Sequence, residues 1–252
     1  MVRCYVALGG NVGPVEQTFD RTLAELGADP RLVLGPRSSA RRTRAVGARS
    51  GGDFLNAAVE LHADLPPLEL LEVLQELEAR HGRTRRGEGR WTPRTLDLDL
   101  LLYGEQVIDL PGLRVPHPAC WYRRFVLDAL AEIAGDVVHP EKGATIRELR
   151  ERLLVRPLPA ALAGGDTGLR QTLIQELSSE FVAATVNEWP AAARTEAPAL
   201  LFWLGEPRPS GPETGAPPAA GFDELPAGSR LDVSQAADAA QEVRDVLTSA
   251  LG

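Results

Sequence analysis

What the sequence has little of limits the kinds of protein that it can encode. Cysteine is scarce: Cys4 and Cys120 are the only 2 in 252 residues, so no disulfide framework is expected and both thiols are predicted to be packing residues. No long apolar stretch occurs, and the start of the chain lacks the basic region, apolar segment and cleavage site of a secretory signal. These absences indicate a cytosolic protein without a membrane span. Lys142 is the only lysine, and a net charge of -8 disfavours general nucleic-acid binding.

The order of the predicted elements indicates an α+β layered fold. With 252 residues and 44% hydrophobic content, the chain can form a sizeable core and a second small domain. Apolar patterns predict strands at residues 4–8, 32–39, 54–61 and 97–103, with 106–110 returning as a hairpin partner of the last. Helices are predicted from Pro14, between Pro66 and Gly82, and at residues 125–133 and 146–154. Because strands and helices do not alternate in a regular βαβ repeat, an α+β layered fold is favoured.

The segment 96–101 carries the first candidate chemistry. Apolar and acidic residues alternate there with the period of a half-buried strand, which sends Asp97 and Asp99 to the same face. Residues two apart on a strand lie roughly 6.5–7 Å from each other, so these carboxylates can bracket a hard cation or a pair of cations. Their repulsion is tolerable mainly when Mg²⁺ or Arg neutralises it. For an isolated Asp-x-Asp motif, the more common interpretation is an edge strand whose acidic face meets solvent or pairs with Arg.

A cationic segment directly precedes these two aspartates. Residues 82–94 read GRTRRGEGRWTPR and include Arg83, Arg85, Arg86, Arg90 and Arg94. Guanidinium groups bind phosphate oxygens in a fork, glycine lets a loop close, and Trp91 offers a flat face to a planar ring. An Arg loop followed by Asp97 and Asp99 predicts Mg²⁺-polyphosphate chemistry, in which the protein positions substrates and neutralises charge. A solvated or nucleic-acid-binding loop is the alternative.

The run RWTPRTLDLDLLLYG, residues 90–104, resembles the signature of the 6-hydroxymethyl-7,8-dihydropterin pyrophosphokinase family of folate biosynthesis. Two further blocks follow the family order, VALGGN near the start and VPHPACWYRRFVLDALAEIA at residues 115–134. The resemblance spans residues 1–157 and leaves 158–252 as an extension of unknown function. It implies a ferredoxin-like fold with a mostly antiparallel sheet, helices packed on it, and an active-site cleft on the sheet. The implied reaction transfers diphosphate from ATP to the hydroxymethyl group of the pterin and releases AMP.

The resemblance also implies roles for individual residues. Asp97 and Asp99 would hold two Mg²⁺ ions, and Arg83 and Arg94 would neutralise charge on the transferred group. Pterin contacts are implied for Gly9, Thr43, Val46, Phe54, Asn56, Trp91 and Phe125, with the two phenylalanines sandwiching the ring. Nucleotide contacts are implied for Gln75, Arg83, Arg85, Trp91, Arg94, Leu100, Arg114, His117 and Arg123.

Without the family, several of these residues would have a simpler interpretation. Phe54 would be a core residue and His117 a structural histidine. Gln75 and Glu78 are possible residues that contact a ligand or support those that do, but on spacing alone they form a solvated helix face.

Four positions depart from the family pattern. Gly10 replaces a usual Ser, Arg41 a common aromatic, Ala45 a Pro that contacts the pterin, and Thr92 a Gly. A β-branched residue at position 92 restricts backbone angles that a closing loop requires. These departures leave open a catalytically weakened pterin- or nucleotide-binding module, and a nucleic-acid-binding protein ranks well below it.

Residues beyond 157 are interpreted from composition alone. The stretch PLPAALAGGD, residues 157–166, is predicted to be a linker. A helix at 169–186, strands at 199–204 and at RLDVS, and a helix at 235–251 follow, an order vaguely similar to the tail of an α/β nucleotide kinase. The sequence contains no Walker-type GxxxxGKS/T run, so no second kinase is inferred. A packing or interface role is expected, with self-association or a neighbouring folate-pathway enzyme as the partner.

Overall fold

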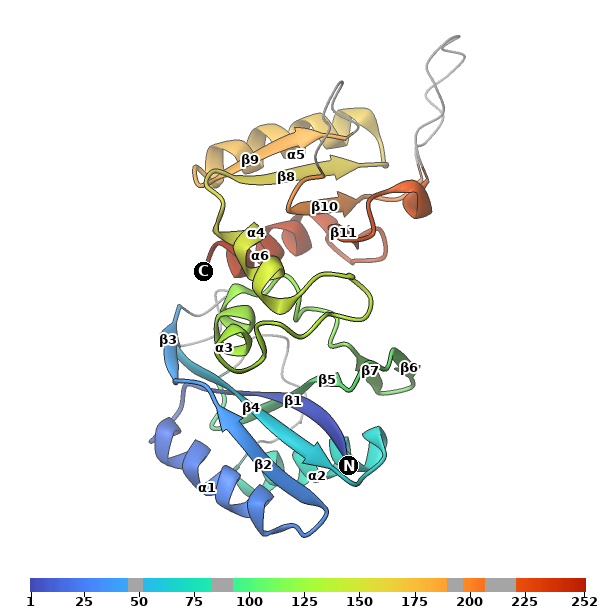
Figure 1. The fold of residues 1–252 in the computed structure, drawn as a ribbon. Coiled ribbons are helices and arrows are strands. Elements are labelled where there is room, and N and C mark those ends of the chain that lie inside the picture. The colour runs from blue at the N-terminus through green and yellow to red at the C-terminus, as the bar shows by residue number, and fades with distance from the viewer. Residues whose placement is uncertain (45–51, 83–92, 190–196, 207–220) are drawn as a thin grey trace. The chain divides into compact units, whose positions relative to one another are not determined.

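A computed structural model describes residues 1–44, 52–82, 93–189, 197–206 and 221–252 of the protein (Figure 1). The chain divides into two compact units, Met1–Arg150 together with Gly252, and Glu151–Leu251. Each unit contains a β-sheet of its own, so each is described separately.

The N-terminal unit is built on an antiparallel sheet. Its strands follow the spatial order β2-β4-β1-β5, and β3 pairs with β4. The predicted fold class, helices packed on a mostly antiparallel sheet, is confirmed. The elements of the sheet and its helices are β1 (Val2–Gly10), α1 (Val15–Ala28), β2 (Leu32–Arg37), β3 (Arg41–Thr43), β4 (Phe54–Ala63), α2 (Pro67–Arg80), β5 (Asp97–Tyr103) and α3 (Arg124–Ala134), with α4 (Ile146–Leu154) following.

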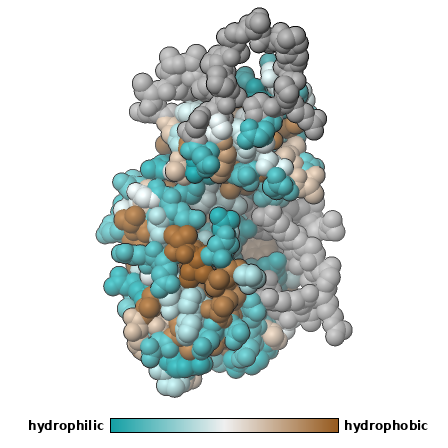
Figure 2. Space-filling view, turned by 90° about the vertical axis from the view of Figure 1, so that its right-hand side faces the viewer, coloured by the Kyte–Doolittle hydropathy of each residue, from teal (hydrophilic) through white to brown (hydrophobic). Residues whose placement is uncertain are grey.

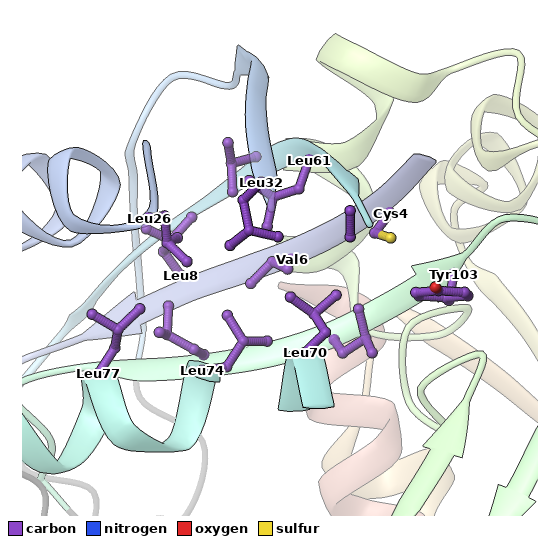
Figure 3. Close-up of a cluster of buried hydrophobic side chains, with 14 of the residues drawn as sticks. Cys4, Val6, Leu8, Leu26, Leu32, Leu61, Leu70, Leu74, Leu77 and Tyr103 are labelled. Atoms are coloured by element: carbon purple, nitrogen blue, oxygen red, sulfur yellow. The ribbon is translucent and has the colours of Figure 1, made fainter. Parts of the chain in front are cut away.

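One face of this sheet carries the main hydrophobic core. In β1 the alternate residues Cys4, Val6 and Leu8 are fully buried on this face, and Figure 3 shows them among leucines of β2, β4, α1 and α2. The helix α2 contributes Leu70, Leu74 and Leu77, whose spacing places all of them on one side of a helix. Because a strand alternates its side chains, the intervening residues of β1, β4 and β5 point to the opposite face, against which α3 packs.

The predicted hairpin between residues 97–103 and 106–110 is wrong. The strand β6 (Ile108–Leu110) pairs with β7 (Leu113–Val115) in a separate two-stranded sheet. Gly112 has a φ of 84°, a left-handed conformation that glycine adopts without strain and that a tight turn between the two short strands uses. The chain therefore reverses one strand later than the apolar pattern suggested.

The C-terminal unit has a parallel sheet. Its strands lie in the order β11-β10-β8-β9, and every pair in it is parallel. The elements are β8 (Leu158–Ala163), α5 (Thr167–Glu180), β9 (Ala184–Glu188), β10 (Leu200–Trp203), a 3-10 helix (Phe222–Glu224), β11 (Arg230–Asp232) and α6 (Ala239–Leu251). The strands at β10 and β11 and the last helix agree with the predictions for those segments.

Two predictions for this unit are wrong. Residues 157–166 are not a linker, because 158–163 form β8, which pairs on both sides and buries Leu158, Ala160 and Leu162 completely. A parallel strand covered on both faces needs no apolar-polar alternation, so its short apolar run looked like a spacer between Pro and Gly residues. The helix predicted at 169–186 ends at Glu180, and Ala184 begins the strand β9.

The described residues on the face drawn in Figure 2 are mainly hydrophilic. Figure 2 shows a largely teal face on which brown side chains gather in one area of the N-terminal unit. Exposed large apolar residues of this unit include Val107, Leu110 and Val138. In the described ranges, no helix combines the length and apolar character that crossing a bilayer requires. Exposed apolar side chains are ordinary in folded proteins, so these residues alone define no function.

Candidate active site

A cavity of about 190 Å³ lies in the N-terminal unit, on the sheet face opposite the leucine core. Side chains from β1, β3, β4, β5 and α3 meet in it. The predicted site residues that line it are Gly9, Thr43, Phe54, Asn56, Arg94, Asp97, Asp99, His117, Arg123 and Phe125. Segments far apart in the sequence therefore supply one site.

Strand alternation explains which residues of the sheet reach the cavity. Phe54 and Asn56 are two apart on β4, and Asp97 and Asp99 are two apart on β5, so each pair shares a face. Gly9 of β1 lies between these strands, opposite Asn56 on one side and Asp97 on the other. A Cβ atom at Gly9 would lie 3.2 Å from Asn56 Oδ1. Glycine at this position thus keeps the floor of the cavity open.

The two carboxylates face positively charged or imidazole partners. Arg94 Nη1 donates to Asp97 Oδ2 at 2.7 Å. The Nε2 atom of His117 lies 3.9 Å from Asp99 Oδ2, and both aspartate side chains remain partly accessible. The site therefore combines carboxylates that can attract cations with basic groups that can attract phosphate.

The orientation of the His117 ring follows from its hydrogen bonds. The backbone N–H of Ala119 donates to Nδ1 at 3.1 Å, so Nδ1 carries no proton. In the neutral ring the proton therefore resides on Nε2, the nitrogen nearer Asp99. The His117 backbone N–H donates to the Leu101 carbonyl at 2.9 Å, which fixes the residue beside β5. His117 accordingly presents a hydrogen-bond donor to the cavity.

The backbone of Arg94 is held from the turn after β1. Its N–H donates to Asn11 Oδ1 at 2.8 Å, and its carbonyl accepts from the Asn11 N–H at 2.8 Å. A Cβ atom at Gly10 would lie 2.7 Å from the Thr95 carbonyl oxygen, a distance that requires something to shift. The departure from Ser at position 10 is thus accompanied by a close approach between this turn and the segment before β5.

Glu78 holds the backbone of the aspartate strand from the side of α2. It lies on α2, is 1% exposed, and its Oε1 accepts from the Leu98 backbone N–H at 2.8 Å. Leu98 stands between the two aspartates, so this bond holds the backbone that carries both. Of the two interpretations of Glu78, a residue that supports the site and a residue of a solvated helix face, the second is wrong. Its position four residues after Leu74, on the apolar stripe of α2, is the signal that could have placed it inward.

An aromatic and amide wall lies beside the carboxylates. Phe54 and Phe125 both line the cavity, and Asn56 Nδ2 donates to Thr43 Oγ1 at 2.7 Å. The Arg123 guanidinium carbon lies 5.9 Å from the centroid of the Phe125 ring, within the range of a cation-π contact. A planar heterocycle with polar edges fits such surroundings.

Some predicted residues lie away from the cavity lining. The Leu100 side chain belongs to the core, Arg114 lies 3.9 Å from Glu141, and Gln75 is half-buried on α2. Predicted residues outside the described part of the chain are Val46, Arg83, Arg85 and Trp91, as are Ala45 and Thr92.

The cavity lining also includes residues that were not predicted. These are Ala7, Leu8, Arg44 and Val126. Arg44 follows Thr43 directly and adds a positive charge, and this adjacency is the signal that could have identified it.

The cysteines lie outside the cavity lining and are unreactive. Both are completely buried and free, and burial raises the pKa of each thiol to about 12. Cys120 Sγ lies 3.3 Å from Nε2 of the buried His139, whose pKa burial lowers to about 4. Thiol and imidazole are therefore both neutral near pH 7, as expected for packing residues.

Comparisons with known proteins point to one family. Residues 5–135 match the family model described as 7,8-dihydro-6-hydroxymethylpterin-pyrophosphokinase (HPPK). The 2-amino-4-hydroxy-6-hydroxymethyldihydropteridine pyrophosphokinase of Synechocystis is 43% identical over 148 residues, covering 59% of this chain and 74% of that protein. The Bacillus subtilis protein of the same name is 44% identical over 144 residues, covering 57% and 83%.

The chain also resembles a longer solved structure, the wild-type HPPK-DHPS of Plasmodium falciparum. The identity is 11% and the TM-score 0.46, with 81% of this chain and 57% of that chain covered. This likeness is too weak to support a conclusion about the residues beyond the family match.

Proposed function

The chain belongs to the 7,8-dihydro-6-hydroxymethylpterin-pyrophosphokinase family, and on that basis we propose how its residues share the work of the reaction. It is a 2-amino-4-hydroxy-6-hydroxymethyldihydropteridine pyrophosphokinase of folate biosynthesis with ATP as co-substrate. The observation that carries the proposal is the meeting of Asp97 and Asp99 with Phe54 and Phe125 in one cavity.

The pterin is proposed to bind between Phe54 and Phe125. Aromatic faces favour a flat ring, and the Asn56 carboxamide, held by Thr43 at 2.7 Å, offers a polar edge of fixed orientation. The hydroxymethyl group then extends toward Asp97 and Asp99. The carboxylates and one face of the pterin site are placed by strands of one sheet, and α3 supplies Phe125, an arrangement that suits a reaction that depends on positioning.

Asp97 and Asp99 are proposed to hold Mg²⁺, two ions by the family resemblance. Their carboxylate oxygens are the donors that Mg²⁺ prefers, and substrate phosphates and water supply the remaining positions. Within the described residues, no group of 3 or more His, Cys, Asp or Glu side chains is gathered as a metal site, in keeping with a metal that depends on substrate for its other ligands. When bound, Mg²⁺ neutralises phosphate charge and activates the attacking hydroxyl.

The basic groups of the cavity are proposed to bind the phosphates. Arg94 and Arg123 offer guanidinium donors and His117 offers its Nε2–H, while Arg83 and Arg85 extend this set by the family resemblance. Arg94, which holds Asp97 in the structure, exchanges that carboxylate for oxygens of the transferred group. Gln75, Leu100 and Arg114 remain proposed nucleotide contacts; they lie outside the cavity lining, and a bound nucleotide would extend beyond it.

The proposed reaction is a single in-line displacement. The hydroxymethyl oxygen forms a bond to the β-phosphorus of ATP while the bond from that phosphorus to the oxygen bridging the α-phosphate breaks. AMP leaves with the bonding electron pair, and the hydroxyl proton is released. The protein forms no covalent intermediate, because positioning and charge neutralisation suffice for this class of transfer.

AMP formation tests this assignment. Purified full-length protein is incubated with ATP, Mg²⁺ and 6-hydroxymethyl-7,8-dihydropterin, beside the double variant Asp97→Ala, Asp99→Ala and the control Asp136→Ala, which alters an exposed surface carboxylate. We expect AMP that depends on the pterin, normal activity in the control, and almost none in the double variant, since each lost charge-stabilising group costs about 100-fold or more. Near-normal turnover by the double variant would contradict the assignment. Ligand binding without AMP in the unaltered protein would favour the binding-module alternative.

For the C-terminal unit we propose a packing or interaction role without a second phosphate site. The Asp166 carboxylate accepts from the Leu169 N–H at 3.0 Å and so occupies the N-terminus of α5. Arg170 donates to the Gly164 carbonyl and to Glu188. A phosphate-binding turn instead directs free N–H groups at its anion. The proposed partner is a second copy of the chain or a neighbouring folate-pathway enzyme.

The proposed location of the enzyme is the cytoplasm. The two cysteines are free and buried, and thiols remain reduced in that compartment.

A further inference from the structure

The end of β3 is tied to the helix α3 by one carboxylate. Arg41 donates to Glu132 Oε1 through Nε at 2.9 Å and through Nη2 at 2.6 Å. Ser39, just before β3, donates to Glu132 Oε2 through Oγ at 2.6 Å and through its backbone N–H at 2.8 Å. The hydrogen bond from Ser39 is the main cause that lowers the pKa of Glu132 below its usual value. Both carboxylate oxygens are thus engaged by the strand side.

This contact lies next to the proposed pterin site on both elements. Arg41 and Thr43 are two apart on β3 and share a face of the strand. Phe125 and Glu132 are seven apart on α3, which is about two helical turns, and share a face of the helix. Thr43 and Phe125 line the cavity. A contact between Arg41 and Glu132 therefore restrains the separation of two elements, β3 and α3, that both contribute residues to the cavity lining.

The strand β3 has few other restraints among the described residues. It spans Arg41–Thr43 and pairs with β4 alone, in a register that sets Arg41 opposite Asn56 and Thr43 opposite Phe54. Thr43 in turn accepts the hydrogen bond from Asn56 Nδ2. A shift of β3 would therefore move the group that orients the Asn56 carboxamide.

We propose that the Arg41–Glu132 pair is a clamp that holds β3 at the separation from α3 that the pterin requires. The inference rests on the proposed function only in taking the pterin as the occupant. Without the clamp, β3 samples positions farther from α3, and only a fraction of molecules presents the lining residues of both elements correctly. The apparent dissociation constant for the pterin rises by the inverse of that fraction. Once the pterin is bound, Asp97 and Asp99 are unchanged, so kcat is preserved.

The exposure of the pair distinguishes this role from a contribution to global stability. The Arg41 and Glu132 side chains are 49% and 27% exposed. Ion pairs this accessible contribute little to folding. The clamp should therefore act on the position of one short strand, with little change in the unfolding midpoint. A merely structural contact would instead lower the midpoint and leave the pterin constants unaltered.

The test compares Arg41→Met, Glu132→Gln and the double variant in the full-length protein. Pterin Kd is measured by fluorescence titration, and kcat with both KM values by AMP formation. We expect a two- to fivefold rise in Kd and KM for the pterin, on the order of one exposed, forked ion pair, with kcat and the Kd of a nonhydrolysable ATP analogue unchanged. The double variant should bind the pterin no more weakly than Glu132→Gln, because Arg41 is proposed to act only through the Glu132 carboxylate, which Glu132→Gln already removes.

Two further variants sharpen the comparison. Arg31→Met is a matched control, because Arg31 also donates through Nε and Nη2 to one partly exposed carboxylate, Asp29, which is not among the residues that line the cavity. Its pterin constants should equal those of the unaltered protein. Arg41→Lys retains the charge without the fork and should restore part of the affinity.

Several outcomes would overturn the clamp. They are an unchanged pterin Kd in Arg41→Met, equal rises for pterin and nucleotide, or additive effects in the double variant. Failure of the proposed function is recognised separately, because the unaltered protein would then form no AMP. The Kd comparison among the variants still tests the clamp in that case.

Discussion

Replacement of Glu78 tests whether the aspartate strand must be held from the core side. The Glu78 side chain is 1% exposed, and its Oε1 lies 2.8 Å from the Leu98 nitrogen. In Glu78→Leu the buried Leu98 N–H loses this acceptor, which costs about 1–3 kcal/mol of stability. Because Leu98 lies between the two aspartates, a backbone shift there displaces both carboxylates. A misplacement of about 1 Å at reacting groups lowers turnover by about 100-fold.

The assay measures kcat by AMP formation and the free energy of unfolding by denaturant titration. Glu78→Gln retains an oxygen acceptor and should keep kcat within about tenfold, since only the charge assistance of one hydrogen bond is lost. Tyr103→Phe is the matched control on the same strand, because it removes the hydrogen bond that Tyr103 Oη donates to the Leu65 carbonyl at 2.6 Å, far from the aspartates. It should lose about 1 kcal/mol of stability with unchanged kcat.

Two results would refute this reasoning. One is a destabilised Glu78→Leu whose kcat stays near that of the unaltered protein, which would show that the carboxylates need no support from α2. The other is an equal loss of kcat in Tyr103→Phe, which would attribute the effect to general loosening of β5.

Two further predictions concern His139 and the C-terminal unit. Burial lowers the pKa of His139 from 6.5 to about 4, so between these values the unfolded chain binds a proton that the folded chain does not. The contribution of His139 to the free energy of unfolding should therefore be highest above pH 6.5 and fall by about 2 kcal/mol between pH 7 and pH 5, at about 1.4 kcal/mol per pH unit. Denaturant titrations of His139→Leu should lack this fall in the free energy of unfolding. The same pH dependence in His139→Leu and the unaltered protein would contradict the prediction. Calorimetric titration of full-length protein with an ATP analogue should give one site per chain, and Arg170→Ala should leave that number unchanged. A second site would contradict the proposal that Asp166 and Arg170 close the turn after β8.

The sequence predicted the central elements of the site because their patterns are local. The alternation at Asp97 and Asp99 requires only a half-buried strand, and both side chains line the cavity as expected. Phe54, Asn56, His117 and Phe125 were identified only through the family resemblance. No local pattern shows that residues from β4, the segment before α3 and α3 itself will meet.

The predictions were wrong where Pro and Gly residues or charged side chains suggested an exposed segment, but tertiary contacts bury it. The strand β8 is bounded by Pro157 and by Gly164 and Gly165, which resemble the ends of a linker, yet parallel neighbours on both sides bury it. The helical pattern past Glu180 continues by coincidence into β9. The supporting role of Glu78 received low weight because an acidic residue is usually solvated, whereas this one is buried with the Leu98 amide as a partner.

The contacts around the cavity limit which parts must move during the reaction. Glu78 fixes the backbone between the aspartates. Asn11 fixes the Arg94 backbone, because it accepts from the Arg94 N–H and donates to the Arg94 carbonyl. The Arg94 guanidinium reaches Asp97 from that fixed backbone. The exchange from carboxylate to phosphate that we propose for Arg94 therefore needs only rotations about side-chain bonds, which take place far faster than backbone rearrangements. If the phosphates arrive with their own cations, Asp97 is released from Arg94 at the moment when another positive charge becomes available to it, so neither charge is left unpaired in a partly buried site.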